Sequence, residues 1–215
     1  MDIVNQQVEE YMRGLLARHD EPVLLEMEAE AKAKSFPIIG RLVGATVELL
    51  ARSIGARRVF ELGSGYGYSA YWFSRAVGGG GEVHCTDGDP SNEPKALGYL
   101  TRADLAGPIR WHAGDAVTHL NATDGEFDVV YNDIDKEGYP DAWRAARERV
   151  RVGGLYICDN VLWYGRVTGA GIESERDRKT TDAILEHNAE IAADDRYLSS
   201  IVPTRDGVMV ALRIA

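Results

Sequence analysis

The sequence predicts an α/β fold built on a doubly wound, mostly parallel sheet that ends in an antiparallel hairpin. Short apolar runs alternate with amphipathic segments from residue 58 onward, a glycine-rich segment follows the first run, and two β-prone runs flank a turn near the carboxyl terminus. A chain of 215 residues with 45% hydrophobic composition is long enough for one sizeable core. We therefore expect a single domain over residues 1–215.

The amino-terminal part of the chain predicts helices, because apolar residues recur there at helical spacing. The first stretch contains Val4, Val8, Tyr11, Met12, Leu15 and Leu16. The second contains Ile38, Leu42, Val43, Val47, Leu49 and Leu50. Between them, residues 22–34 are rich in Glu, Ala and Lys, which favour helix.

Five apolar runs predict parallel strands, and each is followed by a candidate helix. The strands are expected over Arg58–Leu62, Glu82–Thr86, Ile109–His112, Phe127–Asn132 and Leu155–Cys158. The helices are expected to begin near Tyr68, Ser91, Asp115, Glu137 and Glu173. This alternation implies right-handed crossovers that feed a buried parallel sheet with helices on both faces. Tyr197–Val202 and Val208–Ile214 flank the turn signal Pro203–Gly207 and predict the hairpin, which brings the sheet to seven strands.

Composition excludes several classes of protein. The formal net charge of −10 argues against a nucleic-acid partner, because lysine and arginine provide most of the affinity for phosphates. The basic residues Arg144, Arg147, Arg149 and Arg151 are expected on the solvated face of a helix. The chain shows neither a secretory signal pattern nor an apolar stretch of membrane-spanning length, which predicts a cytoplasmic protein with no membrane partner. The two cysteines lie in predicted strands and are expected to be buried thiols.

Ligands of an open doubly wound sheet bind beyond the carboxyl ends of its strands. The first strand leads into Glu61-Leu62-Gly63-Ser64-Gly65-Tyr66-Gly67-Tyr68-Ser69, where glycine permits a sharp turn and close approach of a ligand to the backbone. A structural tight turn is the alternative. The Gly-x-Gly-x-Gly spacing, and the carboxylate of Glu61 beside the place where a pyrophosphate would lie, favour the cationic nucleoside S-adenosylmethionine over a dinucleotide.

Acidic residues also follow the second and third predicted strands. Asp87 lies about twenty residues beyond the glycine loop, where a carboxylate accepts hydrogen bonds from both ribose hydroxyls. For Asp89, a role as the cap of the next helix is as good an interpretation as a role in ligand binding. Asp115, beside Ala116, either accepts from an adenine amino group or caps the helix that follows.

The fourth and fifth predicted strands end in Asp133 and in Asp159-Asn160. Adjacent parallel strands lie about 4.8 Å apart, so the two carboxylates would converge and repel each other unless a cation or a proton lies between them. Oxygen ligands of this kind suit Mg²⁺ or another divalent cation, such as Ca²⁺ or Mn²⁺. The alternative is a helix cap at Asp133 and an ordinary turn at Asp159-Asn160. Lys136 is a surface lysine or, beside a cation that disfavours its charged form, a general base.

Together these motifs resemble those of the cation-dependent class I O-methyltransferases, the family that includes catechol O-methyltransferase and the caffeoyl-CoA O-methyltransferases. The resemblance covers nearly all of residues 35–215 and rests most on Glu61–Ala70, Asp133–Tyr139 and Asp159–Val167. It implies a Rossmann-like class I methyltransferase fold and methyl transfer from S-adenosylmethionine to a hydroxyl of a small catechol or phenolic acceptor. It also implies a homodimer, with residues 1–55 contributing to closure over cofactor and substrate and to the dimer contact.

The resemblance assigns roles to individual residues. Asp133, Asp159 and Asn160 become ligands of magnesium, and Lys136, beside Asp133, becomes the base. The residues expected around S-adenosylmethionine are Glu61, Gly63, Gly65, Ser69, Asp87, Asp115, Ala116 and Asp133. Tyr139, Trp163 and Tyr164 are candidates to flank a flat aromatic acceptor, although aromatic residues near strand ends are as often part of the packing.

Two segments depart from the family pattern. Asn132 stands where the family usually carries an apolar residue, so its side chain needs a polar partner beneath the site. Ser35–Gly40 follows only loosely the segment that closes over cofactor and substrate, which leaves the acceptor open. An NAD-dependent oxidoreductase on a similar sheet is disfavoured by Glu61 and the glycine spacing. A non-catalytic homologue that binds S-adenosylmethionine is disfavoured because the metal and base candidates are all retained.

Overall fold

The computed structural model describes residues 5–17 and 20–215, and Val4 of the first expected helix lies outside this part of the chain. Seven strands form one sheet in the order β3-β2-β1-β4-β5-β7-β6. The strands are β1 (Arg58–Leu62), β2 (Glu82–Asp87), β3 (Ile109–Ala113), β4 (Phe127–Asn132), β5 (Val150–Cys158), β6 (Tyr197–Val202) and β7 (Val208–Arg213). Strands β1 to β5 pair in parallel, and β7 pairs antiparallel with both β5 and β6. The predicted fold class is confirmed.

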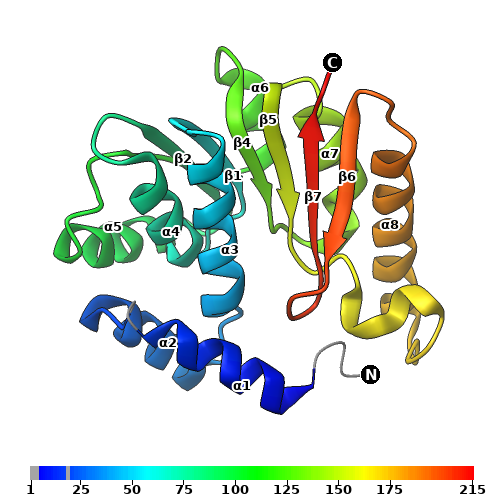
Figure 1. The fold of residues 1–215 in the computed structure, drawn as a ribbon, viewed down its shortest axis with the longest axis horizontal. Helices are drawn as coiled ribbons and strands as arrows, with labels where there is room; N and C mark the ends of the chain where they lie inside the picture. Colours follow the sequence, from blue (N-terminus) through cyan, green and yellow to red (C-terminus); the bar gives the residue numbers. More distant parts are fainter. Residues whose placement is uncertain (1–4, 18–19) are drawn as a thin grey trace.

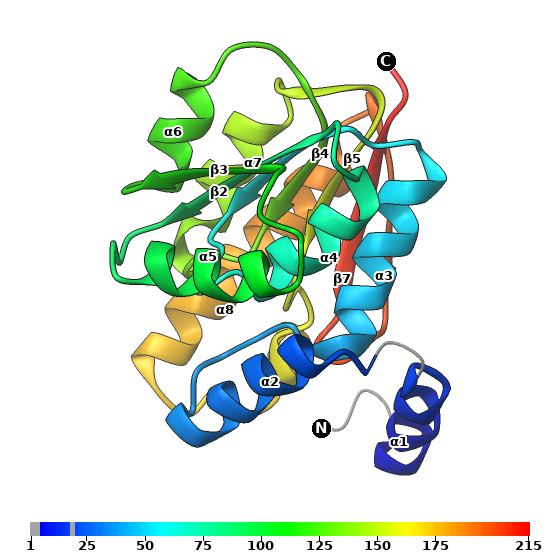
Figure 2. The same ribbon diagram turned by 90° about the vertical axis from the view of Figure 1, so that its left-hand side faces the viewer.

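Helices cover both faces of the sheet (Figures 1 and 2). Their bounds are α1 (Gln6–Leu15), α2 (Pro22–Lys34), α3 (Gly40–Ser53), α4 (Tyr68–Val77), α5 (Asn92–Arg102), α6 (Ala116–Ala122), α7 (Tyr139–Ala146) and α8 (Glu175–Ala192). One apolar cluster joins the sheet to helices α2 to α5, and a second joins it to α6, α7 and α8. Successive residues of β1 serve opposite clusters, Val59 the first and Phe60 the second, as the two-residue period of a strand requires.

Helix α1 lies at the margin of the molecule, where it contacts α3 (Figure 2). None of its residues is buried, and its apolar side chains Val8, Tyr11 and Leu15 are 49%, 68% and 62% exposed. Among residues 5–17 and 20–215, no helix combines the length and the apolarity needed to cross a bilayer.

The structure corrects the expected start of the fifth strand. β5 begins at Val150 rather than at Leu155, because Val150 pairs with Phe127 and the register then shifts before Leu155 pairs with Val129. Gly153 adopts a left-handed φ of 77° within this irregularity. A residue pair such as Gly153-Gly154 indicates a loop in a sequence, but here it allows a bulge inside the strand.

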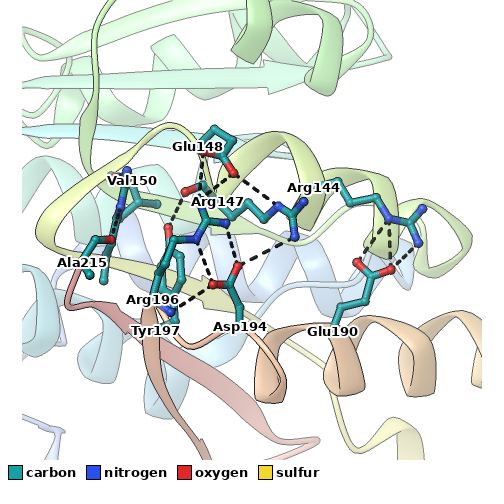
Figure 3. Close-up of polar contacts among 10 residues, drawn as sticks. Arg144, Arg147, Glu148, Val150, Glu190, Asp194, Arg196, Tyr197 and Ala215 are labelled. Carbon is teal, nitrogen blue, oxygen red and sulfur yellow. Dashed lines mark hydrogen bonds and ion pairs between the residues drawn. The ribbon is translucent and has the colours of Figure 1, made fainter.

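The basic cluster expected on one helix is distributed differently, and that prediction is wrong. Only Arg144 belongs to α7, whereas Arg147 caps its carboxyl end and Arg151 lies in β5. Arg144 pairs with Glu190, and Arg147 and Arg196 both pair with Asp194 (Figure 3). These ion pairs lie near the start of β5, at the opposite end of that strand from Asp159, and partner the guanidinium groups within the protein.

Candidate active site

The glycine loop after β1 lies against the end of β4. Gly63, Gly65 and Gly67 all have left-handed φ values, between 51° and 89°. A Cβ atom on Gly63 would lie 2.7 Å from the carbonyl oxygen of Asp133, so only glycine permits this approach. The loop and the candidate metal ligand are therefore direct neighbours.

Glu61, in β1 just before this loop, is a fully buried carboxylate. Its Oε2 accepts hydrogen bonds from Ser64 Oγ at 2.9 Å and from Cys85 Sγ at 3.3 Å. Its Oε1 is buried and has no partner within the described part of the chain. Burial raises the pKa of Glu61 to about 7, against the opposing hydrogen bonds from Ser64 and Cys85. An unsatisfied oxygen at the ligand edge of the sheet indicates a site for a cationic or hydrogen-bonding group.

Asp87 holds the end of β2 against the glycine loop. Its Oδ2 accepts from the Gly65 amide at 2.9 Å, and its Oδ1 accepts from the Asp89 amide at 2.8 Å and from Asn92 Nδ2 at 2.9 Å. Asp89 accepts from the Ser91 amide at 2.9 Å, a bond within the turn before α5, whose N-cap is Ser91 rather than Asp89. A carboxylate has further acceptor capacity, so these bonds leave Asp87 able to accept from a ligand.

Asp115 is the N-cap of α6, where its side chain accepts from the Thr118 amide at 2.7 Å. Hydrogen bonds from the side chain and the amide of Thr118 lower the pKa of Asp115. The capping interpretation is thus confirmed, and a contact with adenine remains a separate prediction. Ala116 begins the helix and is buried.

Asp133 and Asp159 follow directly on residues that face each other in the sheet. Asn132 of β4 is the register partner of Cys158 of β5, and the Asp159 amide donates to the Asn132 carbonyl at 3.2 Å. Burial and the nearby charge of Asp133 raise the pKa of Asp159 to about 7, and burial likewise raises that of Asp133. The Oδ1 of Asp159 is buried without a partner in the described residues. The two carboxylates therefore lie at adjacent strand ends, as predicted, and the charge of Asp133 acts on Asp159.

Lys136 and Trp163 lie around this acidic pair. Lys136 Nζ donates to Asp133 Oδ1 at 3.0 Å and to the Ile134 carbonyl at 3.3 Å. It also lies 4.9 Å from the centre of the Tyr139 ring and 5.9 Å from that of Trp163. The structure thus gathers the base candidate, one metal-ligand candidate and two of the three aromatic candidates.

The three aromatic candidates differ in how far their side chains are exposed to solvent. Tyr139 is fully buried and donates its hydroxyl proton to the Asp159 carbonyl at 2.9 Å, which makes it a support beneath the acidic pair. Trp163 is half-buried and donates to Thr180 Oγ1 at 3.2 Å. Tyr164 is 62% exposed, with its ring centre 5.3 Å from that of Trp163. Trp163 and Tyr164 are the two with exposed surface left for a ligand.

The loop that carries Trp163 and Tyr164 has a strained backbone, and hydrogen bonds to another part of the chain hold it in place. Asn160, Trp163 and Tyr164 have backbone φ values of 58°, 46° and 53°, which residues other than glycine rarely adopt. The β6–β7 turn holds the loop: the Leu162 amide donates to the Asp206 carbonyl at 2.9 Å, and the Tyr164 amide donates to Asp206 Oδ1. Such strain persists only where the surroundings enforce it.

Sequence reasoning assigned the residues of this turn no part in the site. Arg205 donates to the carbonyl of Ile38 at 2.9 Å and to that of Ile39, so the turn also holds the segment between α2 and α3. Asp206 is 8% exposed and keeps one buried oxygen without a partner in the described residues. The local sequence predicts only a hairpin turn, because the partners of Arg205 lie more than 160 positions away.

Residues 17–214 match a family model described as O-methyltransferase. Caffeoyl-CoA O-methyltransferase 1 of Eucalyptus globulus is 30% identical over 179 residues, which cover 80% of this chain and 73% of that protein.

Two solved structures share the fold. The O-methyltransferase of Bacillus cereus, in complex with S-adenosylhomocysteine (SAH), has a TM-score of 0.84 at 24% identity and covers 96% of this chain and 97% of its own. The O-methyltransferase TomG from Streptomyces achromogenes, in complex with S-adenosylmethionine (SAM), has a TM-score of 0.81 at 23% identity and covers 91% of each chain. The oxidoreductase alternative is thereby set aside, and the chain belongs to the O-methyltransferase family of S-adenosylmethionine-dependent enzymes.

Proposed function

We propose that this O-methyltransferase depends on a divalent cation and methylates one hydroxyl of a small catechol-type acceptor. The observation that carries the proposal is the acidic pair Asp133 and Asp159 at the ends of adjacent strands. Asp159 is 2% exposed and has an oxygen without a partner among the described residues. A cation would partner that oxygen and favour the ionised form of both carboxylates.

The donor set fits magnesium better than a softer metal. It comprises the two carboxylates and the amide of Asn160, whose left-handed φ of 58° marks a constrained backbone position. Within residues 5–17 and 20–215, no three side chains of His, Cys, Asp or Glu come together as a metal-binding group. Magnesium is commonly held by one or two carboxylates and retains several waters, so a set of this size suits it.

For S-adenosylmethionine we propose the carboxyl ends of β1, β2 and β3 as the binding region. Glu61 supplies a buried negative charge for the ammonium or sulfonium group, and the glycine loop permits close approach. The complexes of the Bacillus cereus enzyme with SAH and of TomG with SAM, which share the fold, support this assignment. The residues proposed are Glu61, Gly63, Gly65, Ser69, Asp87, Asp115, Ala116 and Asp133.

In the proposed reaction, Lys136 takes the proton of the acceptor hydroxyl. Its Nζ is held between Asp133 and the rings of Tyr139 and Trp163, so it cannot swing freely into solvent. The phenolate oxygen then forms a bond to the methyl carbon while the bond from that carbon to sulfur breaks, which leaves SAH and a methyl ether. A divalent cation supplies positive charge that favours both the ionised acceptor and the neutral amine of Lys136. Trp163 and Tyr164 would flank the acceptor ring.

Chelation and the variant Lys136→Ala test this proposal. We expect EDTA to abolish methyl transfer to a panel of catechols, caffeoyl esters and flavonoids, and magnesium to restore it. Lys136→Ala should lower kcat by about a hundredfold or more while the affinity for SAH changes by less than about twofold. Lys179→Ala is the matched control, because this lysine is exposed and pairs only with Glu137 in the described structure.

Two results would contradict the proposal. Full activity after exhaustive chelation would exclude the dependence on a cation. Equal losses of SAH affinity and turnover in Lys136→Ala would exclude its role as the base, because a base contributes to the chemical step rather than to cofactor binding.

A further inference from the structure

A chain of buried side-chain hydrogen bonds lies beneath the acidic pair. Asn132 Nδ2 donates to Tyr156 OH at 3.0 Å, and Tyr156 OH lies 2.9 Å from His187 Nε2. His187 Nδ1 lies 3.0 Å from Asn188 Oδ1, and Asn188 Nδ2 donates to the Val161 carbonyl at 2.9 Å. Asn132, Tyr156 and His187 are all 0% exposed. The polar partner that Asn132 was expected to need is thus present.

The two ends of this chain adjoin the two segments of the candidate metal site. Asn132 directly precedes Asp133, and Val161 directly follows Asn160. The middle of the chain belongs to α8, which supplies both His187 and Asn188. A single helix is therefore linked through Tyr156 to Asn132, the residue before one acidic strand end, and is bonded directly to Val161, which follows the other.

One assignment of donors and acceptors satisfies every hydrogen bond in this network. When His187 is neutral with its proton on Nδ1, the Tyr156 hydroxyl donates to Nε2 and Nδ1 donates to Asn188, so every group meets a partner. Burial lowers the pKa of His187 to about 4, which keeps the ring neutral at physiological pH. A fully satisfied buried network specifies one arrangement of its members, whereas an apolar core tolerates several.

We propose that His187 and Asn188 are positioning residues of the active site, which act through this chain to fix the strand ends that carry Asp133 and Asp159-Asn160. Neither residue has to touch the acceptor or the cofactor for this role. The metal-binding part of the inference rests on the proposed function, but the fixing of the two strand ends does not. Tyr139 adds a second link, because it donates to the Asp159 carbonyl while its ring centre lies 5.2 Å from that of His187.

The variants Tyr156→Phe and Asn188→Ala each break the chain at one point. Tyr156→Phe deletes only the hydroxyl that joins Asn132 to His187, and Asn188→Ala releases the Val161 carbonyl. Tyr197→Phe is the matched control, because it also deletes a hydroxyl of a buried tyrosine, one that donates to the Arg147 carbonyl at 2.7 Å near the start of β5, at the opposite end of that strand from Asp159. Circular dichroism serves to check that each of the three variants is folded before the measurements.

Amide hydrogen exchange of the ligand-free protein is the first measurement. Exchange in residues 133–136 and 159–163 should quicken by about tenfold in Tyr156→Phe and Asn188→Ala, and should not change in Tyr197→Phe. In a Mn²⁺ titration, the same two variants should lose about tenfold or more in affinity while SAH affinity is kept. The double variant should lose little more than the worse single variant, because both break one chain.

The outcomes separate the positioning role from the proposed function. Unchanged exchange in both segments, or an equal increase in Tyr197→Phe, would overturn the positioning role. Faster exchange in the two segments of a protein whose wild type binds no Mn²⁺ would uphold the positioning role and overturn the cation dependence.

Discussion

Glu61, which we propose faces the cofactor, illustrates how the burial of a single carboxyl group couples its ionisation to folding. Burial raises its pKa in the folded chain to about 7, from an ordinary value of 4.5. Between these two pH values the unfolded chain ionises this group while the folded chain keeps it protonated. Glu61 therefore destabilises the ligand-free fold as pH rises from 4.5 towards 7, and the full penalty is present above pH 7.

The variant Glu61→Gln should consequently gain stability relative to wild type as pH rises from 4.5 to 7, and it should keep that gain above pH 7. At pH 8 the gain in unfolding free energy should reach at most about 3 kcal/mol, less the value of the hydrogen bonds that the amide makes poorly, and near pH 4.5 it should vanish. Wild-type SAH affinity should increase through pH 7 as the carboxylate ionises, and the variant should lack this dependence. Thermal melts and calorimetry at several pH values measure both effects.

Glu48→Gln provides the control for this prediction. Glu48 is also buried, but its carboxylate is paired with Arg52 and Arg75, so its removal should destabilise the protein at both pH values. An equal stability difference between wild type and Glu61→Gln at pH 5 and pH 8 would refute the assignment of a raised pKa to Glu61.

Some residues of the candidate site could be predicted because they follow apolar runs in the sequence. Other residues carry no such local pattern. Asp133, Asp159 and Lys136 follow apolar runs that end at the ligand edge of a sheet, so strand prediction alone brings them together. His187 could not be found in this way, since it lies in a largely polar helix and its partner Tyr156 lies in a distant strand. Its role depends on which face of α8 meets the sheet, which the local sequence does not specify.

At the scale of elements, the β6–β7 turn connects two segments that border the candidate site. Through Arg205 it holds the carbonyls of Ile38 and Ile39, and through Asp206 it holds the strained loop at Leu162 and Tyr164. The segment expected to close over cofactor and substrate and the loop expected to flank the acceptor are thus bonded to the same hairpin.

Arg205→Ala should therefore loosen the segment between α2 and α3. We expect proteolysis and amide exchange to increase at residues 35–40, and KM for the acceptor to rise by severalfold, about 1 kcal/mol, with a smaller change in kcat. Arg213→Ala is the matched control, because Arg213 also donates to a backbone carbonyl, that of Val150, at the other end of the sheet. A rise in KM of the same size in both variants would show that the effect is not specific to this turn.

Strand β5 shows why element boundaries are harder to predict than element order. Its order in the sheet follows from the apolar run Leu155–Cys158, but its first residues continue through Gly153-Gly154. A Cβ atom on Gly154 would lie 2.8 Å from the Asp128 carbonyl oxygen, so the glycine is required by a contact with the neighbouring strand. That contact is a property of the assembled sheet and leaves no local signal.

For the whole molecule, the strand order places the proposed cofactor region beside the proposed cation region. The order β3-β2-β1-β4-β5 reverses direction between β1 and β4, and ligands of open α/β sheets bind at such a switch point. Glu61 and the glycine loop belong to β1, whereas Asp133 follows β4 and Asp159 follows β5. The proposed cofactor and cation regions therefore meet where Gly63 approaches Asp133, which is where a methyl group would pass between them.

The surface of α1 bears on the assembly of the whole molecule. Val8, Tyr11 and Leu15 recur at helical spacing, so they share one face, and all three are exposed. Monomeric proteins rarely expose a contiguous apolar patch of large area. We propose that two copies of this chain cover these faces in a homodimer, with α1 in the contact.

Tyr11→Glu should then convert the dimer to a monomer in sedimentation velocity at micromolar concentration, because a buried unpaired carboxylate opposes association. Leu198→Glu is the control, since Leu198 is 65% exposed on β6, at the open edge of the sheet. If Leu198→Glu dissociates the protein and Tyr11→Glu does not, the contact lies along the sheet edge instead. A wild type that sediments as a monomer at the same concentration would exclude the dimer.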